Sequence, residues 1–305
     1  MSRAVTRAAA ATAIVGAATL GWALAEARAY TLREYDVPVL PPGHTPIRLL
    51  HISDLHLLPS DLRRIEWVKR LERYQPDLVI TTGDNLSHPE AVPAVAEAMS
   101  PFLGVPGAFV TGSNDYYEPV PKNPFAYFRT RDSVPPPSPT PTLPAAALKD
   151  VLTSRGWLDL DNARGRLRAQ DSTIDLVGTG DAHIDAAHYP EPQGPSRRAD
   201  VRLGVTHAPY QRVLQRMRLD GVDLALAGHT HGGQICLPWF GALVTNCDID
   251  RRMARGLHRW PGKPESSQSD EQMWLHVSAG LGTSPFTPIR FACRPEASLL
   301  TLTAK

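Results

Sequence analysis

The feature that most constrains the fold is a short apolar run that ends in a polar cluster, repeated along the chain. Each run has four to six residues, a length typical of a buried strand, and turn-forming residues bound it. The runs are residues 47–52, 77–81, 108–111, 202–206 and 222–227. Helix-like segments separate several of them. This alternation predicts an α/β layered fold in which helices cover the faces of the sheets.

The segments between and after these runs extend the prediction. Apolar residues recur every three positions in residues 60–74, which indicates a helix with one buried face that Pro76 ends. Further helices are expected at residues 90–103, 145–155 and 210–219, and further strands at residues 158–160, 166–168 and 173–178. We expect residues 274–277 and 297–301 to complete a second, more antiparallel sheet.

The polar clusters after the runs contain residues that bind metals. Asp54 and His56 follow the first run, and His229 and His231 follow the last. In extended backbone, positions two apart project to the same side, so each pair can reach one point. The other strand-end candidates are Asp84, Asn114 and His207. Ligands of α/β folds bind beyond the carboxyl ends of the strands, although a solvated pair or a satisfied polar edge is the alternative for His229 and His231 taken alone.

These seven nitrogen and oxygen donors are too many for one tetrahedral zinc ion. They fit two divalent ions that share a bridging carboxylate. The set contains no cysteine, and its imidazoles favour Mn, Fe or Zn, with Mg also compatible. The three cysteines of the chain, Cys236, Cys247 and Cys293, have no C-x-x-C spacing and leave at most one disulfide bridge.

The order of these motifs resembles that of the calcineurin-like metallophosphoesterases. The resemblance runs from residue 47 to the C-terminus and rests on Asp54-x-His56, Gly83-Asp84, the Gly112 cluster, His207 and Gly228-His229-x-His231. Residues 232–234, residues 278–283 and an apolar N-terminal segment are similar to those of the bacterial membrane-associated phosphodiesterases. The resemblance implies a four-layer α/β/β/α sandwich of two mixed β-sheets, with a dimetal site at the strand ends.

The resemblance also implies which residue binds which ion. Asp84 bridges the two ions. Asp54, His56 and His231 complete one site, and Asn114, His207 and His229 complete the other. A bridging hydroxide then attacks the phosphorus in line, so the implied activity is phosphoester hydrolysis, of a phosphodiester or a pyrophosphate on a membrane or envelope-linked substrate.

One motif departs from the family pattern. The family has Gly-Asn-His followed by Asp or Glu, with Asn as a metal ligand and His as a proton donor, whereas this chain has Gly112-Ser113-Asn114-Asp115. Either the ligand is Asn114, which we favour because an amide oxygen is the better donor, or it is Ser113. Asp115 is the candidate acid in place of the histidine. His51 and His183 are candidates for contacts with substrate or ligands, or are structural.

The N-terminus predicts association with a membrane. Arg3 and Arg7 precede an uncharged apolar segment, residues 8–25, so residues 1–29 are either an anchor or a signal peptide cut after residues 27–29. The basic residues favour an extracytoplasmic domain. Residues 30–46, rich in proline, are expected to form an extended tether to the catalytic domain, residues 47–305. Within that domain, residues 118–144 hold nine prolines and form either a lid or a surface insertion.

The composition argues against a nucleic-acid partner, and the motifs leave two other functions possible. A net charge of +1 gives no reason to expect a nucleic-acid partner, and we expect a monomer. An anchored phosphomonoesterase or nucleotidase is one alternative to the diesterase. A binding or regulatory protein with a degenerate dimetal site is another, because the usual imidazole donor is missing.

Overall fold

The fold is built on two six-stranded sheets, seen in a computed structural model that describes residues 3–121, 140–194, 198–262 and 272–305. Strands β2, β3, β4 and β5 of the first sheet run parallel, β14 is antiparallel to β2, and β1 is parallel to β14. Across the sheet the order is β1(Thr31–Leu40), β14(Glu296–Ala304), β2(Ile47–Ile52), β3(Leu78–Thr81), β4(Gly107–Phe109) and β5(Leu158–Asp159).

The second sheet has a parallel centre and antiparallel edges. Its order is β12(Gly256–Trp260), β13(Met273–Val277), β9(Leu224–Ala227), β8(Val201–Val205), β7(Ser172–Gly178) and β6(Arg164–Ala169). Every residue of β8 and β9 is buried. Parallel strands covered on both faces have this pattern, which is why their sequences are continuous apolar runs.

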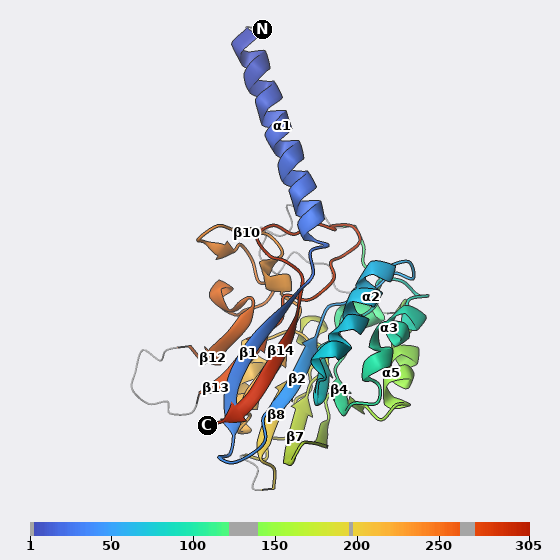
Figure 1. Cartoon of the computed structure of the whole chain (residues 1–305), viewed down its shortest axis with the longest axis vertical. Helices are drawn as coiled ribbons and strands as arrows, with labels where there is room; N and C mark the ends of the chain where they lie inside the picture. Colours follow the sequence, from blue (N-terminus) through green and yellow to red (C-terminus); the bar gives the residue numbers. More distant parts are fainter. Residues whose placement is uncertain (1–2, 122–139, 195–197, 263–271) are drawn as a thin grey trace.

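Helices cover the outer faces of both sheets (Figure 1). The first sheet carries α2(Leu62–Lys69), η1(Arg70–Tyr74), α3(Val92–Met99), η2(Ser100–Phe102) and α5(Ala145–Thr153), and the second carries α6(Gln211–Leu219). A central apolar cluster, with Leu49 and Ile80 from one sheet and Leu203 and Leu226 from the other, fills the space between the sheets. The four-layer α/β/β/α sandwich is therefore confirmed.

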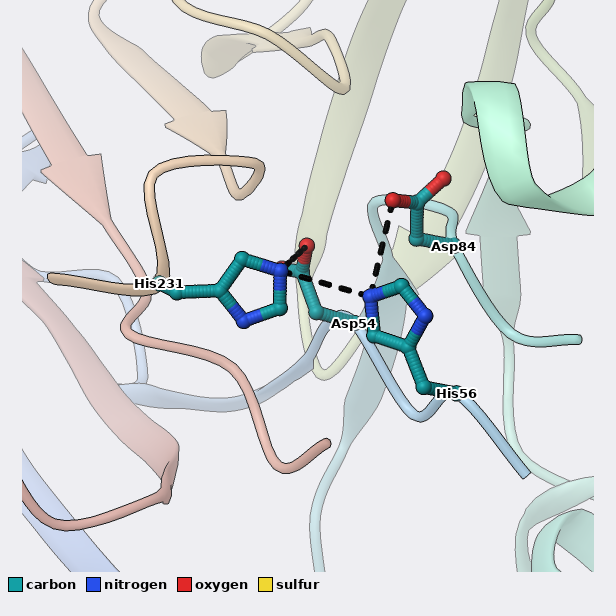
Figure 2. A group of neighbouring side chains, drawn as sticks. All are labelled: Asp54, His56, Asp84 and His231. Carbon is teal, nitrogen blue, oxygen red and sulfur yellow. Dashed lines mark hydrogen bonds and ion pairs between the residues drawn. The ribbon is translucent and has the colours of Figure 1, made fainter. Parts of the chain in front are cut away.

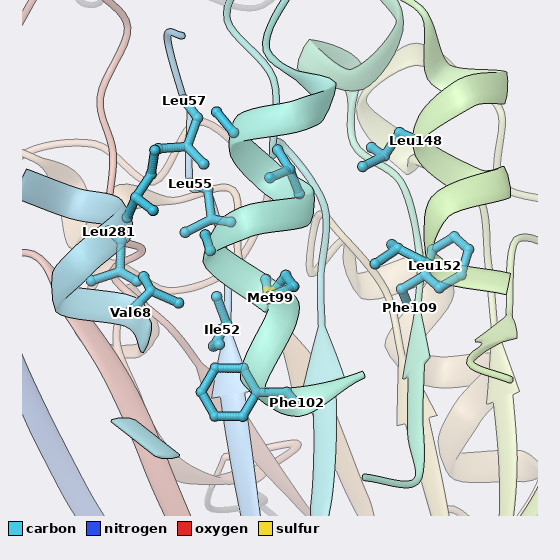
Figure 3. Packing of buried hydrophobic residues seen from close by; sticks show 14 of the residues in the cluster. Ile52, Leu55, Leu57, Val68, Met99, Phe102, Phe109, Leu148, Leu152 and Leu281 are labelled. Carbon is cyan, nitrogen blue, oxygen red and sulfur yellow. The ribbon is translucent and has the colours of Figure 1, made fainter. Parts of the chain in front are cut away.

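The outer core of the first sheet shows why its helices form where they do. Ile65, Val68 and Leu71 are buried at the three-residue spacing seen in the sequence. Met99 and Phe102 pack beside them against the sheet (Figure 3). The helical segment ends at Gln75, whose φ of 46° is left-handed, directly before Pro76.

Two segments differ from the sequence-based expectation. Residues 30–46 are extended, but Thr31–Leu40 forms β1, an edge strand bonded to β14 rather than a free tether. The C-terminal strand β14 lies in the first sheet, not the second, because it pairs with β2 and β1. Both differences come from pairing between the two ends of the chain, which no local pattern reveals.

The N-terminal segment forms α1(Arg3–Glu26), which projects from the sandwich (Figure 1). None of the helices in the described part of the chain has the length and hydropathy needed to span a bilayer. Most of the proline-rich loop expected at residues 118–144, namely residues 122–139, lies outside the described residues. The remaining short elements are α4(Ser113–Tyr116), η5(Ala182–Ile184), η6(His231–Gly233), β10(Cys236–Leu237), β11(Gly241–Ala242) and η7(Arg251–Met253).

Candidate metal centre

The loops at the carboxyl ends of strands from both sheets meet at one place. Asp54 and His56 follow β2, Asp84 follows β3, and His231 follows β9 (Figure 2). One ligand atom from each of these four residues lies within 4.8 Å of the ligand atoms of the other three. The structure therefore brings together side chains up to 177 positions apart in the sequence, as the numbers of Asp54 and His231 show.

The backbone of these loops is unusual. Five of the candidate ligands have left-handed backbone, with φ of 50° at Asp54, 42° at His56, 54° at Asp84, 69° at His229 and 50° at His231. Each such conformation costs a non-glycine residue about 1–3 kcal/mol, and strain of this kind concentrates at functional sites. The rest of the fold must hold these loops in place.

Small residues allow the loops to approach closely. A Cβ on Gly228 would collide with the Ser53 and Asp54 side chains, and a Cβ on Gly112 would collide with Asp84 and His207. The glycines that precede the ligands in the sequence motifs are therefore required by packing between the two sheets' loops.

The first group of donors, Asp54, His56, Asp84 and His231, surrounds a single point. The Nε2 atoms of His56 and His231 are 3.3 Å apart. His56 Nε2 lies 3.6 Å from Asp84 Oδ2, and His231 Nε2 lies 3.6 Å from Asp54 Oδ1. Two ring nitrogens and two carboxylate oxygens at these separations match the donor set of a divalent cation.

The second group of donors consists of His207, His229 and Asn114, which also meet at Asp84. Its Oδ2 atom lies 3.4 Å from His207 Nε2, which is 3.3 Å from His229 Nδ1. The Asn114 side-chain amide is 2.8 Å from the same Oδ2. Amide oxygen and nitrogen exchange places on a 180° rotation, so Asn114 can turn its oxygen toward a cation here. Asp84 Oδ2 is thus shared by the two groups.

Hydrogen bonds at the far side of each ring decide which nitrogen faces the centre. His207 Nδ1 is 2.6 Å from the Thr82 carbonyl, His229 Nε2 is 3.1 Å from that of Asn246, and His231 Nδ1 is 3.1 Å from that of Gly282. A carbonyl only accepts, so these ring nitrogens carry the proton and donate it. The opposite nitrogens keep a lone pair for a metal, the arrangement found in metal-ligating histidines.

The charges of the buried candidate ligands also favour the binding of cations. Burial lowers the pKa of His56 to about 4 and holds the pKa values of His229 and His231 well below the usual range, so these rings are neutral. Burial raises the pKa of Asp54 to about 6. Burial alone would lower the pKa of His207, but Asp84 and Asp181 raise it well above its usual value. The carboxylates around His207 therefore favour a proton on its ring, and a divalent cation bound there would replace that proton and supply the positive charge that the site needs.

Asp115, the candidate acid in place of the histidine, lies in an environment that does not suit that role. It is fully buried, and its carboxylate accepts hydrogen bonds from the backbone N–H groups of Gly112, Asp84 and Asn85 at 3.0, 2.9 and 2.7 Å. Burial, with the charge of Asp84, raises its pKa to about 7. These bonds fix the backbone on both sides of the shared ligand, so the structure places Asp115 behind Asp84.

The two other histidines that the sequence suggested lie in different positions. His51 is fully buried in β2, where it contacts His276 and Thr82 Oγ1, and Thr82 connects through Ser53 to Asp54. His183 is half-buried beside the second group, with its ring centroid 4.5 Å from that of His229. Of these two histidines, His183 is therefore the one whose ring contacts the ring of a candidate ligand.

Several residues that support the centre were not found from the sequence. Arg290 is fully buried and donates to the carbonyls of Ala279 and Gly282 at 2.7 Å, and to that of His231 at 3.3 Å. It fixes the loop that orients His231. A lone arginine that binds mainly carbonyl groups has no recognisable spacing. Asn246 acts through its main chain and has no signal either.

An α/β/β/α sandwich with a carboxylate shared between two imidazole-rich groups at its strand ends defines a metal-dependent hydrolase of phosphoric esters. The sequence model of the calcineurin-like phosphoesterases matches residues 47–233, so the chain belongs to the calcineurin-like phosphoesterase family. The family prediction and the prediction of a phosphoric ester hydrolase that binds divalent metal are confirmed.

Relatives of known name support the same conclusion. The chain is 26% identical to the uncharacterised metallophosphoesterase YkoQ of Bacillus subtilis (strain 168), over 84% of each chain. It is 26% identical to the phosphodiesterase YaeI of Escherichia coli (strain K12), over 84% of this chain and 82% of that one. It is 24% identical to the UDP-2,3-diacylglucosamine pyrophosphatase LpxG of Chlamydia trachomatis serovar D, over 83% of each.

Proposed function

We propose that this protein hydrolyses a phosphodiester or pyrophosphate bond of a membrane or envelope-linked substrate, with two divalent ions bound at the centre. The proposal rests on the position of Asp84 Oδ2. This atom lies 3.6 Å from His56 Nε2 of the first group and 3.4 Å from His207 Nε2 of the second. One carboxylate within reach of two sets of ring nitrogens is what a pair of ions requires.

The seven predicted ligands divide between the two ions. Asp54, His56 and His231 would hold one ion, Asn114, His207 and His229 would hold the other, and Asp84 would hold both. Mn, Fe or Zn suit the imidazoles, and Mg remains compatible with the oxygen donors. When bound, such ions lower the pKa of a water molecule for attack on phosphorus and neutralise the phosphate charge. The bond from water to phosphorus then forms as the bond to the leaving oxygen breaks.

The protein's own groups orient this chemistry. Asn114 lies against the shared carboxylate through both its backbone N–H, at 2.7 Å from Oδ1, and its side chain, which supports it rather than Ser113 as the ligand. The Ser113 N–H instead donates to Asp181, at 2.9 Å. Asp115 positions Asp84 from behind and is not the residue that faces the leaving group.

His183 is our candidate for the imidazole that the Ser113-Asn114 motif lacks. Asp181 accepts hydrogen bonds from both the His183 and the Ser113 N–H groups, at 2.8 and 2.9 Å, and so fastens one loop to the other. The His183 ring also lies 3.1 Å from the Tyr210 hydroxyl. It contacts the substrate phosphate or the leaving oxygen, and this favours an enzyme over a regulatory protein with a degenerate site.

A membrane or envelope-linked substrate fits what surrounds the domain. Exposed apolar side chains run along α1, and the pyrophosphatase LpxG, a relative, is named for a diacylated sugar nucleotide. In this proposal residues 1–29 associate with the membrane as an anchor or signal and lead directly into β1 of the sandwich, and the catalytic domain lies outside the cytoplasm as a monomer.

The test compares two soluble esters with purified protein and added Mn²⁺. Turnover of bis-p-nitrophenyl phosphate faster than that of p-nitrophenyl phosphate supports the diesterase, and the reverse order supports the phosphomonoesterase. No turnover of either ester, in protein shown to contain metal, would favour the binding protein. His183→Asn should lower kcat about a hundredfold with little change in metal content, and an unchanged kcat would remove His183 from the mechanism.

A further inference from the structure

The surface beside the metal centre exposes large apolar side chains on one short hairpin. β10 and β11 pair with only two residues each, and the tip between them presents Trp239 and Phe240. Trp239 is fully exposed at 104% and Phe240 is 55% exposed. Ile235 and Leu237 of the same hairpin segment are also exposed. We call these four residues the apolar tip surface.

The apolar tip surface is attached to the base of α1. Phe291 bonds with Gln234 and Cys236, at 3.1 and 2.8 Å, and so holds the start of the hairpin. Its neighbours Arg290 and Ala292 donate to Ala23 and Glu26, at 3.0 and 3.1 Å. One segment therefore binds both α1 and the hairpin, which lie at the same end of the molecule (Figure 1).

The exposed apolar residues of α1 are not confined to one face. They are Ile14, Val15, Leu20, Trp22 and Leu24. Successive residues of an α-helix are about 100° apart, so these positions are distributed around the axis. A helix that packs on one protein partner has a single apolar stripe, whereas a helix that is apolar on all sides suits a lipid environment.

Basic residues flank the tip. The Arg251 guanidinium lies 4.2 Å from the centre of the Phe240 ring, and the Arg252 side chain is 88% exposed. Together with Trp239 they line an open hollow of about 550 Å³. Asp250 pairs with Arg252 at 2.7 Å, so Asp250, Arg251 and Arg252 together carry one net positive charge. Exposed tryptophan with arginine is typical of protein surfaces at a lipid interface, where arginine meets anionic headgroups.

The hairpin also connects directly to the centre. It starts shortly after the ligand His231, and the chain returns at Asn246, whose carbonyl accepts from the ligand His229. The segment that follows the hairpin therefore contacts the second group of donors.

We propose that the apolar tip surface, with Arg251 and Arg252, docks on an anionic lipid bilayer beside α1 and holds the metal centre at the membrane surface. Trp239 and Phe240 enter the headgroup region, and the arginines bind lipid phosphates. This docking does not depend on the proposed substrate, because binding to lipid is measured without turnover.

The test is flotation of the purified full-length chain with vesicles of phosphatidylcholine alone or mixed equally with phosphatidylglycerol. Trp239→Ser/Phe240→Ser should weaken binding to the mixed vesicles about tenfold or more. The matched control is Leu62→Ser/Leu219→Ser, which removes two leucines that are 66% and 54% exposed on α2 and α6. This control should bind like the unmodified chain, and both variants should keep their metal content and turnover of a soluble diester.

Two further measurements separate lipid from protein partners. Arg251→Gln/Arg252→Gln should remove the preference for phosphatidylglycerol, and Trp239→Phe should lower quenching of fluorescence by brominated lipid. Equal vesicle binding by the hairpin variant and the control would overturn the proposal. So would sedimentation of the unmodified chain as an oligomer that the hairpin substitutions dissociate, because the surface would then bind a second copy.

Discussion

The two sheets contribute different chemistry to the same centre. The first sheet supplies the oxygen donors Asp54, Asp84 and Asn114 and one imidazole, His56, whereas the second supplies only imidazoles, His207, His229 and His231. Each proposed ion takes ligands from both sheets. Neither half of the chain can therefore build a complete ion site, and metal binding should follow the packing of the two sheets against each other.

The sheets also differ in how they hold their imidazoles. Backbone carbonyls hold His207, His229 and His231, and such groups cannot be removed by substitution. His56 instead contacts the Ser87 hydroxyl, 3.3 Å from Nδ1. Substitution can therefore disturb the orientation of His56, from the first sheet, more easily than that of the three histidines from the second sheet.

The largest effect is expected at the residue that belongs to both groups. Asp84→Ala should abolish binding of both ions and lower turnover about a thousandfold or more, because Asp84 Oδ2 lies beside a ring nitrogen of each group. Elemental analysis after dialysis measures the stoichiometry. Asp36→Ala, which removes an exposed carboxylate on β1, is the control. Retention of either ion by Asp84→Ala would contradict the shared position.

Removing one imidazole from each sheet should separate the two ions. His56→Ala and His207→Ala should each leave about one ion per chain and lower turnover about a hundredfold. The remaining ion should differ in the two variants, which electron paramagnetic resonance of Mn²⁺-loaded protein can distinguish. Identical spectra for the two variants would show that the centre holds a single ion site.

The amide donor provides a smaller and more specific test. Asn114→Ala should weaken the ion held with His207 and His229 about 10- to 100-fold and leave the other ion in place. Ser113→Ala is the matched control at the adjacent position and should not change metal affinity. The opposite result would move the ligand to Ser113.

The smallest effect is expected from the hydroxyl that supports His56. Ser87→Ala should weaken one ion about tenfold, because the ring keeps its position but loses the partner of Nδ1. Ser100→Ala, whose hydroxyl bonds only to the nearby Glu97 carbonyl at 2.8 Å, serves as the control. Isothermal titration of Mn²⁺ into metal-free protein gives both affinities. Equal affinities for Ser87→Ala and Ser100→Ala would show that this support is dispensable.

Much of this arrangement is visible in the sequence because the strands are local signals. The runs ending near Asp54, Asp84, His207 and His229 are buried strands, and their polar ends converge because parallel strands share one edge. Strand β1 was not predicted: it mixes polar and apolar residues, contains Pro38, and forms by pairing with the C-terminal strand. Such pairing is a property of the whole chain.

The roles of individual acids and histidines were harder to predict. The sequence identifies Asp115 as an acid next to the centre but not its complete burial, which directs it to backbone N–H groups. Similarly, nothing local places the His183 ring beside His229, because long-range packing brings the η5 loop there. Residue type and spacing predict ligands, whereas burial and orientation decide the supporting roles.

The pairing of β1 with β14 joins the two ends of the chain mechanically. Because β1 follows α1 and runs parallel to β14, tension on α1 is carried by the whole ladder in shear instead of opening it one bond at a time. A pull on the helix is therefore resisted by the last strand of the sequence. A truncation that removes β14 should release β1 from the sandwich, while residues 290–293 still bind the base of α1.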